Sequence, residues 1–123
     1  MKTGTLITAV VLVVFATGCA GSYAVPTQRM ADAQSAHRSA RELGADQIPA
    51  SQLHLKLAEE QIAKANTVLK DNEPRRADFM LIRAKADAEL ALALAREQKS
   101  KVEAQAAVEK ANAQATTNQG APQ

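Results

Sequence analysis

A regular spacing of alanine along the C-terminal half of the chain limits the fold more than any other feature. Between residues 77 and 95, alanine or leucine recurs at alternating steps of four and three, at Ala77, Leu81, Ala84, Ala88, Ala91 and Ala95. A second set with similar steps is Leu55, Ala58, Ile62, Ala65 and Leu69. Residues at this spacing form a seam along one side of a helix, and such seams pack against each other. Because alanine is small, the sequence predicts two helices in close contact.

Proline and glycine separate the predicted helices, which cover residues 27–43, 49–70 and 74 to beyond 110. Gly44 is expected to stop the first helix, while Pro49 and Pro74 start the second and third. The short turn between the last two favours an antiparallel pair. We find no strand-like alternation in the sequence. The predicted fold is therefore all-α: an antiparallel helical hairpin or a three-helix bundle with a long C-terminal helix, whose end projects or frays.

The few aromatic residues and the balanced charge argue against a large globular core and against a nucleic acid partner. The chain has one Tyr, two Phe and no Trp, so a large globular core is not expected. Without residues 1–18 it carries fourteen Lys and Arg against thirteen Asp and Glu. Arg75 and Arg76 are offset in the sequence by Glu73 and Asp78. The sequence lacks a basic patch with interleaved aromatics, so we expect no nucleic acid partner.

The first eighteen residues have the order of a secretory signal peptide: a positive start at Lys2, an apolar run over 6–15, and small residues before Cys19. A membrane span is the competing interpretation. Crossing a bilayer takes about 20 apolar residues, and this run gives way to small and polar residues too early. We therefore predict an exported protein.

Cys19 is the only cysteine, and "ATGC" resembles the lipobox of bacterial lipoproteins, with Ala16 where Leu is usual. The resemblance implies that the thiol carries a diacylglycerol and that the chain is cut before Cys19. Cleavage by ordinary signal peptidase, for which Ala16 and Gly18 are suitable, is the alternative. It would leave an odd free thiol in an oxidising compartment, so lipidation is favoured. By the sorting rule of enteric lipoproteins, Ala20 implies the outer membrane.

The predicted organisation follows from these segments: signal peptide 1–18, lipidated tether 19–26, helical domain 27–115 and disordered tail 116–123. The region 44–96 resembles a small Ala-rich helical family of unknown function, found in outer-membrane lipoproteins of Gram-negative bacteria and sometimes placed ahead of an OmpA-like domain. The matching positions are Gly44, Ala45, Pro49, Leu53, Ala58, Ala65, Ala77, Ala84, Ala88 and Ala95. No OmpA-like domain follows here, and the family has no established catalytic residues to transfer.

Residues with catalytic or metal-binding potential do not form a recognisable site. His37 and His54 fall on different predicted helices without ligand spacing around them, and we interpret both as surface or interfacial. Adjacent Glu59 and Glu60 point about 100° apart on a helix, and Glu60 is placed to meet Lys64. The pair at 97 and 101 repeats that spacing. We expect no catalytic residue, no metal and no cofactor.

A second apolar face is predicted on the third helix, nearly opposite its alanine seam. Its large members are Phe79, Ile82 and Leu90. The first helix could cover this face and give a closed three-helix monomer. Alternatively, the face packs against another copy or an envelope protein, with these three residues as anchors.

The predicted function is that of an envelope lipoprotein, held on the periplasmic face of the outer membrane with a structural or protein-interaction role. A helical binding module for a small apolar or lipid ligand is the alternative. An enzyme is the least supported class.

Overall fold

The computed structural model describes residues 23–119, which form one continuous helical unit. The elements are α1 (Thr27–Glu42), the short 3-10 helix η2 (Ala45–Gln47), α2 (Pro49–Lys70) and α3 (Pro74–Gln119). Residues 23–119 contain no strand. The all-α prediction, with packed helices and a long C-terminal helix, is confirmed. The predicted signal peptide, Cys19 and the start of the predicted tether lie outside the described residues.

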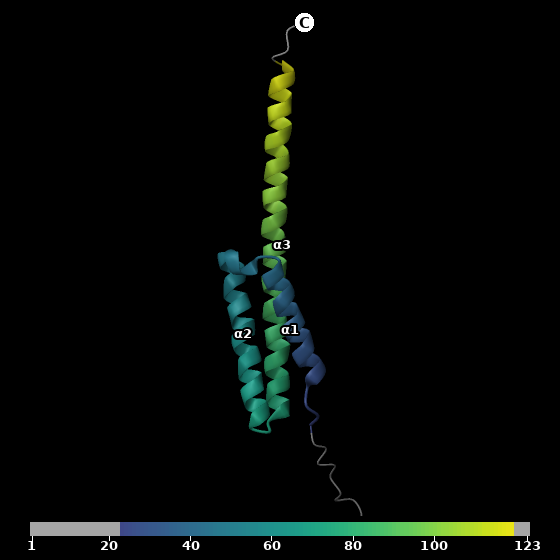
Figure 1. Ribbon diagram of the computed structural model, residues 1–123, viewed down its shortest axis with the longest axis vertical. Helices are drawn as coiled ribbons and strands as arrows, with labels where there is room; N and C mark the ends of the chain where they lie inside the picture. Colours follow the sequence, from purple (N-terminus) through teal and green to yellow (C-terminus); the bar gives the residue numbers. More distant parts are fainter. Residues whose placement is uncertain (1–22, 120–123) are drawn as a thin grey trace, which may run out of the picture.

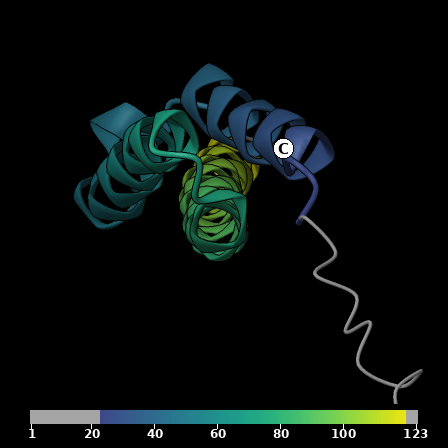
Figure 2. The same cartoon turned by 90° about the horizontal axis from the view of Figure 1, so that it is seen from below.

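Helix α3 is the central element of the bundle. Figure 1 shows α2 and α3 side by side and antiparallel, joined by a tight turn at the lower end, with α1 crossing α3. The view along the axis in Figure 2 shows α1 and α2 lying over the same side of α3. Both pack mainly against α3 and less against each other. Helices α1 and α2 therefore both pack on one side of α3.

The turns use the residues that the sequence provides for them. Gly44 has φ 82°, a left-handed conformation that glycine adopts without a steric penalty. Asn72, in the α2–α3 turn, has φ 60°, and asparagine is among the few other residues that tolerate this region. Next to it, the Glu73 N–H donates to the Val68 carbonyl at 3.0 Å. Pro49 and Pro74 each begin a helix, as predicted.

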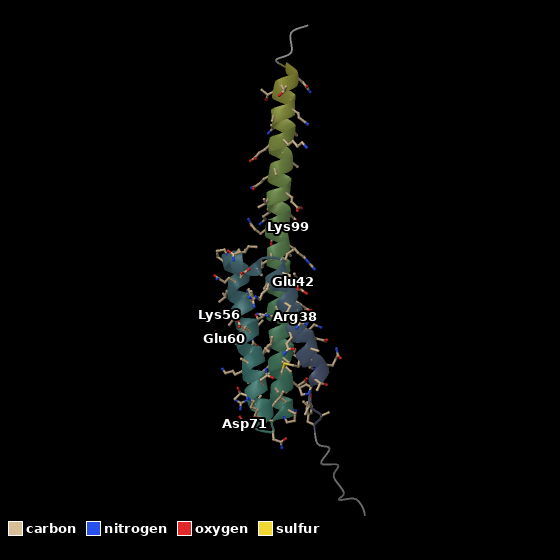
Figure 3. All side chains as sticks on the ribbon, in the orientation of Figure 1. Arg38, Glu42, Lys56, Glu60, Asp71 and Lys99 are labelled. Carbon is tan, nitrogen blue, oxygen red and sulfur yellow. The ribbon has the colours of Figure 1, made fainter. Side chains whose placement is uncertain are left out.

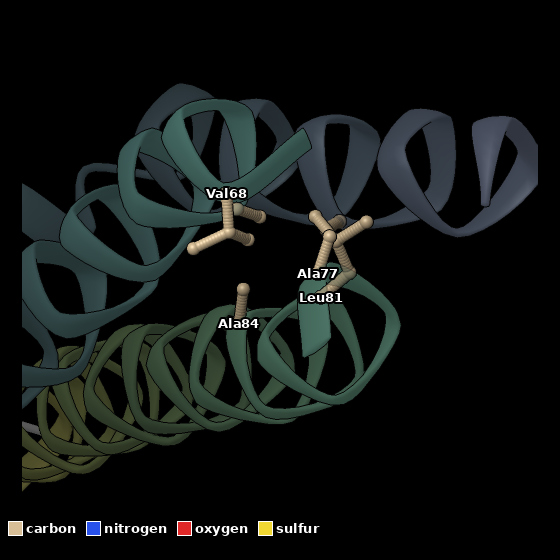
Figure 4. Packing of buried hydrophobic residues seen from close by; sticks show 6 residues of the cluster. Val68, Ala77, Leu81 and Ala84 are labelled. Carbon is tan, nitrogen blue, oxygen red and sulfur yellow. The ribbon is translucent and has the colours of Figure 1, made fainter. Parts of the chain in front are cut away.

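The core is a thin layer of alanine. All six residues of the predicted α3 seam are buried. On α2, Leu55, Ala58 and Ala65 are buried, Ile62 and Leu69 are half-buried, and Val68 joins the core. Figure 4 shows Val68 facing Ala84 across the α2–α3 contact, with Ala77 and Leu81 beside them. Ala33 and Ala40 of α1 and Ala45 of η2 complete the core.

Beyond Ala95, α3 leaves the bundle as a single helix. Every residue from Arg96 to Asn118 is exposed, and we call residues 96–119 the arm. At about 1.5 Å per residue, the 46 residues of α3 span roughly 69 Å, of which the arm is about half. Figure 3 shows side chains leaving the arm in all directions above Lys99. The C-terminal part therefore projects beyond the bundle.

The arm extends four residues into the segment expected to be a disordered tail. The Thr116 and Thr117 hydroxyls donate to the carbonyls of Asn112 and Ala113, at 3.0 and 2.9 Å, and add to the helical hydrogen bonds there. Residues 120–123 lie outside the described range. None of the helices among residues 23–119 has the length and hydropathy that a membrane span needs.

Because the helices are in close contact at the seam, a larger side chain there should destabilise the fold. Replacing Ala84 or Ala88 by leucine should lower the free energy of unfolding by about 1–3 kcal/mol, because the added methylenes have no space. Urea denaturation monitored by circular dichroism measures this. Ala86→Leu is the matched control, since Ala86 is exposed on the same helix. Seam variants as stable as the Ala86 variant would contradict close packing.

Candidate functional site

The predicted second face of α3 is exposed. Phe79, Ile82 and Leu90 have exposed fractions of 57%, 41% and 43%. Together with the exposed Ala86 and Ala93 they form an apolar stripe opposite the buried seam, which we call the outward stripe. At about 100° per residue its members cluster around the direction diametrically opposite Ala77. This is an exposed apolar surface on a helix that the bundle holds in place.

Helix α1 does not close the outward stripe. Ala33 of α1 packs in the cluster that also contains Ala65, Ala77 and Leu81, on the seam side of α3. Of the two arrangements that the sequence left open, a monomer in which α1 covers the second face does not occur. Among residues 23–119, nothing buries Phe79, Ile82 or Leu90.

Charged side chains border the outward stripe. On one flank, the Lys85 Nζ lies 3.7 Å from Asp32 on α1 and 3.8 Å from Glu89 on the next turn. On the other flank Arg83 is exposed. At about 100° per residue Asp78 falls on the same flank as Lys85, but it is buried, with an exposed fraction of 4%. The flanks give the stripe a polar rim, as protein interfaces commonly have.

Asp78 is the centre of a polar cluster that fixes the N-terminal segment. The Tyr23 hydroxyl donates to Asp78 Oδ2 at 2.7 Å, and Arg29 of α1 forms an ion pair with Asp78 Oδ1. The hydrogen bond to Asp78 raises the pKa of Tyr23 above 10.0, because deprotonation would break the bond and set two negative charges together. The buried carboxylate thus joins Tyr23 and Arg29 to the first turn of α3.

Helical spacing in the sequence does not predict this cluster. The sequence showed only that Glu73 and Asp78 offset the charge of Arg75 and Arg76. In the structure Arg76 donates to Glu73 at 3.2 Å, whereas Asp78 binds Tyr23 and Arg29. Tyr23 and Asp78 are 55 residues apart, beyond the reach of helical spacing rules. The available signal was the position of Asp78, next to Ala77 at the edge of the seam, where a charge is expected to need a partner.

A hollow lies at the α2–α3 turn, beside the cluster. It has a volume of about 580 Å³ and is open to solvent. Tyr23 and Phe79 contribute aromatic rings, and Pro74 adds apolar surface. Its remaining lining residues are Asn72, Glu73, Arg75 and Arg76. The hollow therefore combines apolar walls with guanidinium groups.

Both histidines occupy helix interfaces, as predicted. His54 Nδ1 lies 3.0 Å from Asp87 Oδ1, and Gln61 donates to Asp87 Oδ2 at 2.6 Å, which links α2 to α3. Burial lowers the pKa of His37, so its ring favours the neutral form. Residues 23–119 contain no group of three or more His, Cys, Asp or Glu side chains placed to hold a metal ion. We assign no reaction to these groups.

Surface ion pairs follow helical spacing, although the partners differ in one case. Glu60 pairs with Lys56 at 4.0 Å, one turn before it, although the spacing predicts Lys64 as its partner. The predicted pair of Glu97 and Lys101 is present at 2.6 Å. Exposed pairs of this kind contribute little to stability.

Tyr23 is the only tyrosine in the chain, so its titration can be followed without interference. We expect its tyrosinate absorbance to appear at higher pH in the native protein than in urea. Asp78→Asn should move the midpoint down toward 10.0, and Asp32→Asn, a carboxylate away from Tyr23, should leave it unchanged. Equal midpoints in native and unfolded protein would contradict the hydrogen bond.

Comparison with known proteins identifies a family. Residues 28–107 match the domain described as Domain of unknown function (DUF4398), which covers about two thirds of the chain. The matched region contains the bundle and continues into the first half of the arm. No curated protein and no solved structure matches the chain. The protein belongs to the DUF4398 family of domains of unknown function.

Proposed function

We propose that this protein is a lipid-anchored envelope protein with a structural or protein-interaction role and no catalytic activity. It is attached through Cys19 to the periplasmic face of the outer membrane, and it binds a second copy or another envelope protein through the outward stripe. The exposure of Phe79, Ile82 and Leu90 on one face of α3 is the observation that carries this proposal.

The outward stripe has the properties of an interaction surface. Three large apolar side chains on one helix face, bordered by charges, form a patch of the kind that marks protein interfaces. The α3 backbone that carries the stripe is already fixed by packing along the alanine seam. Binding a partner would therefore carry no entropic cost for ordering that backbone. Phe79 is the most exposed of the three and Ile82 the least.

The position of the anchor relative to the fold supports a membrane-attached role. Cys19 precedes Tyr23 by four residues, and Tyr23 is held on the first turn of α3 by Asp78. Helix α3 starts at that end and runs away from it for its whole length (Figure 1). With the chain anchored at Cys19, the arm would therefore extend away from the bilayer and reach partners at a distance.

The alternative function is a binding module for a small apolar or lipid ligand, and the hollow at the α2–α3 turn is the observation that favours it. Its walls include both described aromatic side chains, Tyr23 and Phe79. Small-molecule sites usually enclose most of their ligand, however, and this hollow is open to solvent. An interaction role therefore agrees better with the structure.

Lipid attachment is tested by the intact mass of the protein isolated from its membrane. We expect a chain that begins at Cys19 and carries the added mass of acyl groups. Cys19→Ser should abolish both the added mass and membrane association, because one or more buried acyl chains supply the membrane affinity. An unmodified, water-soluble wild-type product would refute the anchor.

Two experiments test the outward stripe. Sedimentation of the delipidated protein over a wide concentration range measures self-association. Mild crosslinking in envelope extract detects a partner protein. Ile82→Glu/Leu90→Glu should remove self-association or the crosslinked partner, since interface anchors typically cost more than about 2 kcal/mol when lost. Leu53→Glu/Ala63→Glu, at exposed positions of α2, adds the same charge as a control.

Two outcomes would contradict the role of the stripe. The first is a wild-type protein that stays monomeric and captures no partner. The second is a stripe variant that unfolds, which would assign Ile82 and Leu90 to the intramolecular core despite their exposure.

A further inference from the structure

The end of the molecule where α2 turns into α3 carries a second amphipathic surface, which shares only Phe79 with the outward stripe. Tyr23 and Phe79 line the hollow there, and their exposed fractions are 47% and 57%. Val25, 59% exposed, follows Tyr23 in the segment that leads into α1. We call the surface formed by Tyr23, Pro74, Arg75, Arg76 and Phe79 the turn-end surface.

The turn-end surface has a small excess of positive charge. Lys70, Arg75 and Arg76 lie at this end together with Asp71 and Glu73. Arg76 holds Glu73 at 3.2 Å, and Asp78 is already engaged by Arg29 and Tyr23. Among residues 23–119, no carboxylate forms an ion pair with Arg75. A guanidinium without a partner beside two exposed aromatic rings suits an anionic group next to apolar chains.

The length of chain between the anchor and the fold limits where this surface can lie. Tyr23 follows Cys19 by four residue steps, and an extended chain covers at most about 3.3–3.6 Å per step, or roughly 14 Å. Tyr23 itself lines the hollow. A lipid on Cys19 therefore keeps Tyr23, and with it the turn-end surface, within roughly 14 Å of the point of attachment, close enough to contact the bilayer surface. The arm leaves the bundle at the opposite end (Figure 1).

We propose that the turn-end surface docks on the anionic phospholipid surface to which the protein is anchored, with Tyr23 and Phe79 in the headgroup region and Arg75 and Arg76 on lipid phosphates. This inference rests on the proposed lipid anchor at Cys19. Aromatic side chains concentrate at the membrane–water interface, and basic side chains near an anionic leaflet are attracted to it. Docking gives the anchored protein a defined orientation, with α3 directed away from the membrane.

A single tryptophan reports on this orientation, because the chain has none of its own. Phe79→Trp is introduced into the full protein, and the lipidated product is reconstituted in phosphatidylethanolamine–phosphatidylglycerol vesicles with brominated acyl chains. Bromine quenches tryptophan only at short range. We expect blue-shifted, quenched emission for Phe79→Trp. Val108→Trp, an exposed position on the arm, should be neither shifted nor quenched.

Charge reversal then tests the basic side chains. Arg75→Glu/Arg76→Glu in the Phe79→Trp background should reduce the docked-to-undocked ratio roughly fivefold or more per residue, the equivalent of about 1 kcal/mol for each basic group. The docked-to-undocked ratio of the Phe79→Trp protein, with Arg75 and Arg76 in place, should fall in the same way when phosphatidylcholine replaces phosphatidylglycerol. Arg96→Glu/Lys99→Glu, at two exposed basic positions of the arm, is the matched control and should retain quenching.

Failure of the anchor and failure of docking give different results. The mass spectrum reports acylation before reconstitution. If Cys19 is not acylated, a maleimide lipid coupled to this single cysteine places the chain on the same vesicles, and the surface is still tested. Absent quenching at Phe79→Trp, equal quenching at Val108→Trp, or quenching that is insensitive to both charge reversal and phosphatidylcholine would each overturn the proposal.

Discussion

Close packing of alanine along one side of α3 is the constraint on which the rest of the structure depends. Small side chains allow α1 and α2 to approach the α3 backbone, and each contact buries little surface, so both helices are needed to cover the seam. Because both lie on the same side, the opposite side of α3 is left open. The exposure of Phe79, Ile82 and Leu90 is thus a consequence of the packing that makes the bundle.

A second constraint, the burial of Asp78, brings the N-terminal segment to one end of the bundle, opposite the end from which the arm leaves. Asp78 is buried at the edge of the seam and binds Tyr23 and Arg29, so the N-terminal segment enters the fold beside the first turn of α3. The α2–α3 turn and its hollow lie at this end, and the arm leaves from the other. In Figure 3, Asp71 lies at the turn end and Lys99 lies where the arm leaves the bundle. An anchor at Cys19, together with this polarity, would orient the whole protein.

Features set by local spacing could be predicted from the sequence. The α3 seam, the starts of α2 and α3 at Pro49 and Pro74 and the stop at Gly44 depend on residues within one or two helical turns of each other. The side on which α1 packs and the partners of Asp78 depend on contacts between distant segments, which periodicity does not encode. The Lys56 pairing of Glu60 shows the same limit on a smaller scale: both neighbours, Lys56 and Lys64, are one turn away, and spacing alone does not choose between them.

With the proposed anchor at Cys19, the bundle would lie beside the bilayer and direct a single helix away from it. Neutron reflectometry of the lipidated protein on a supported anionic bilayer measures the protein density along the membrane normal. The proposed orientation predicts a dense layer about 33 Å thick against the headgroups, for residues 74–95 and the helices beside them, and then a sparse layer that ends roughly 70 Å away. A single layer about as thin as the bundle is wide, with no density beyond it, would contradict the claim.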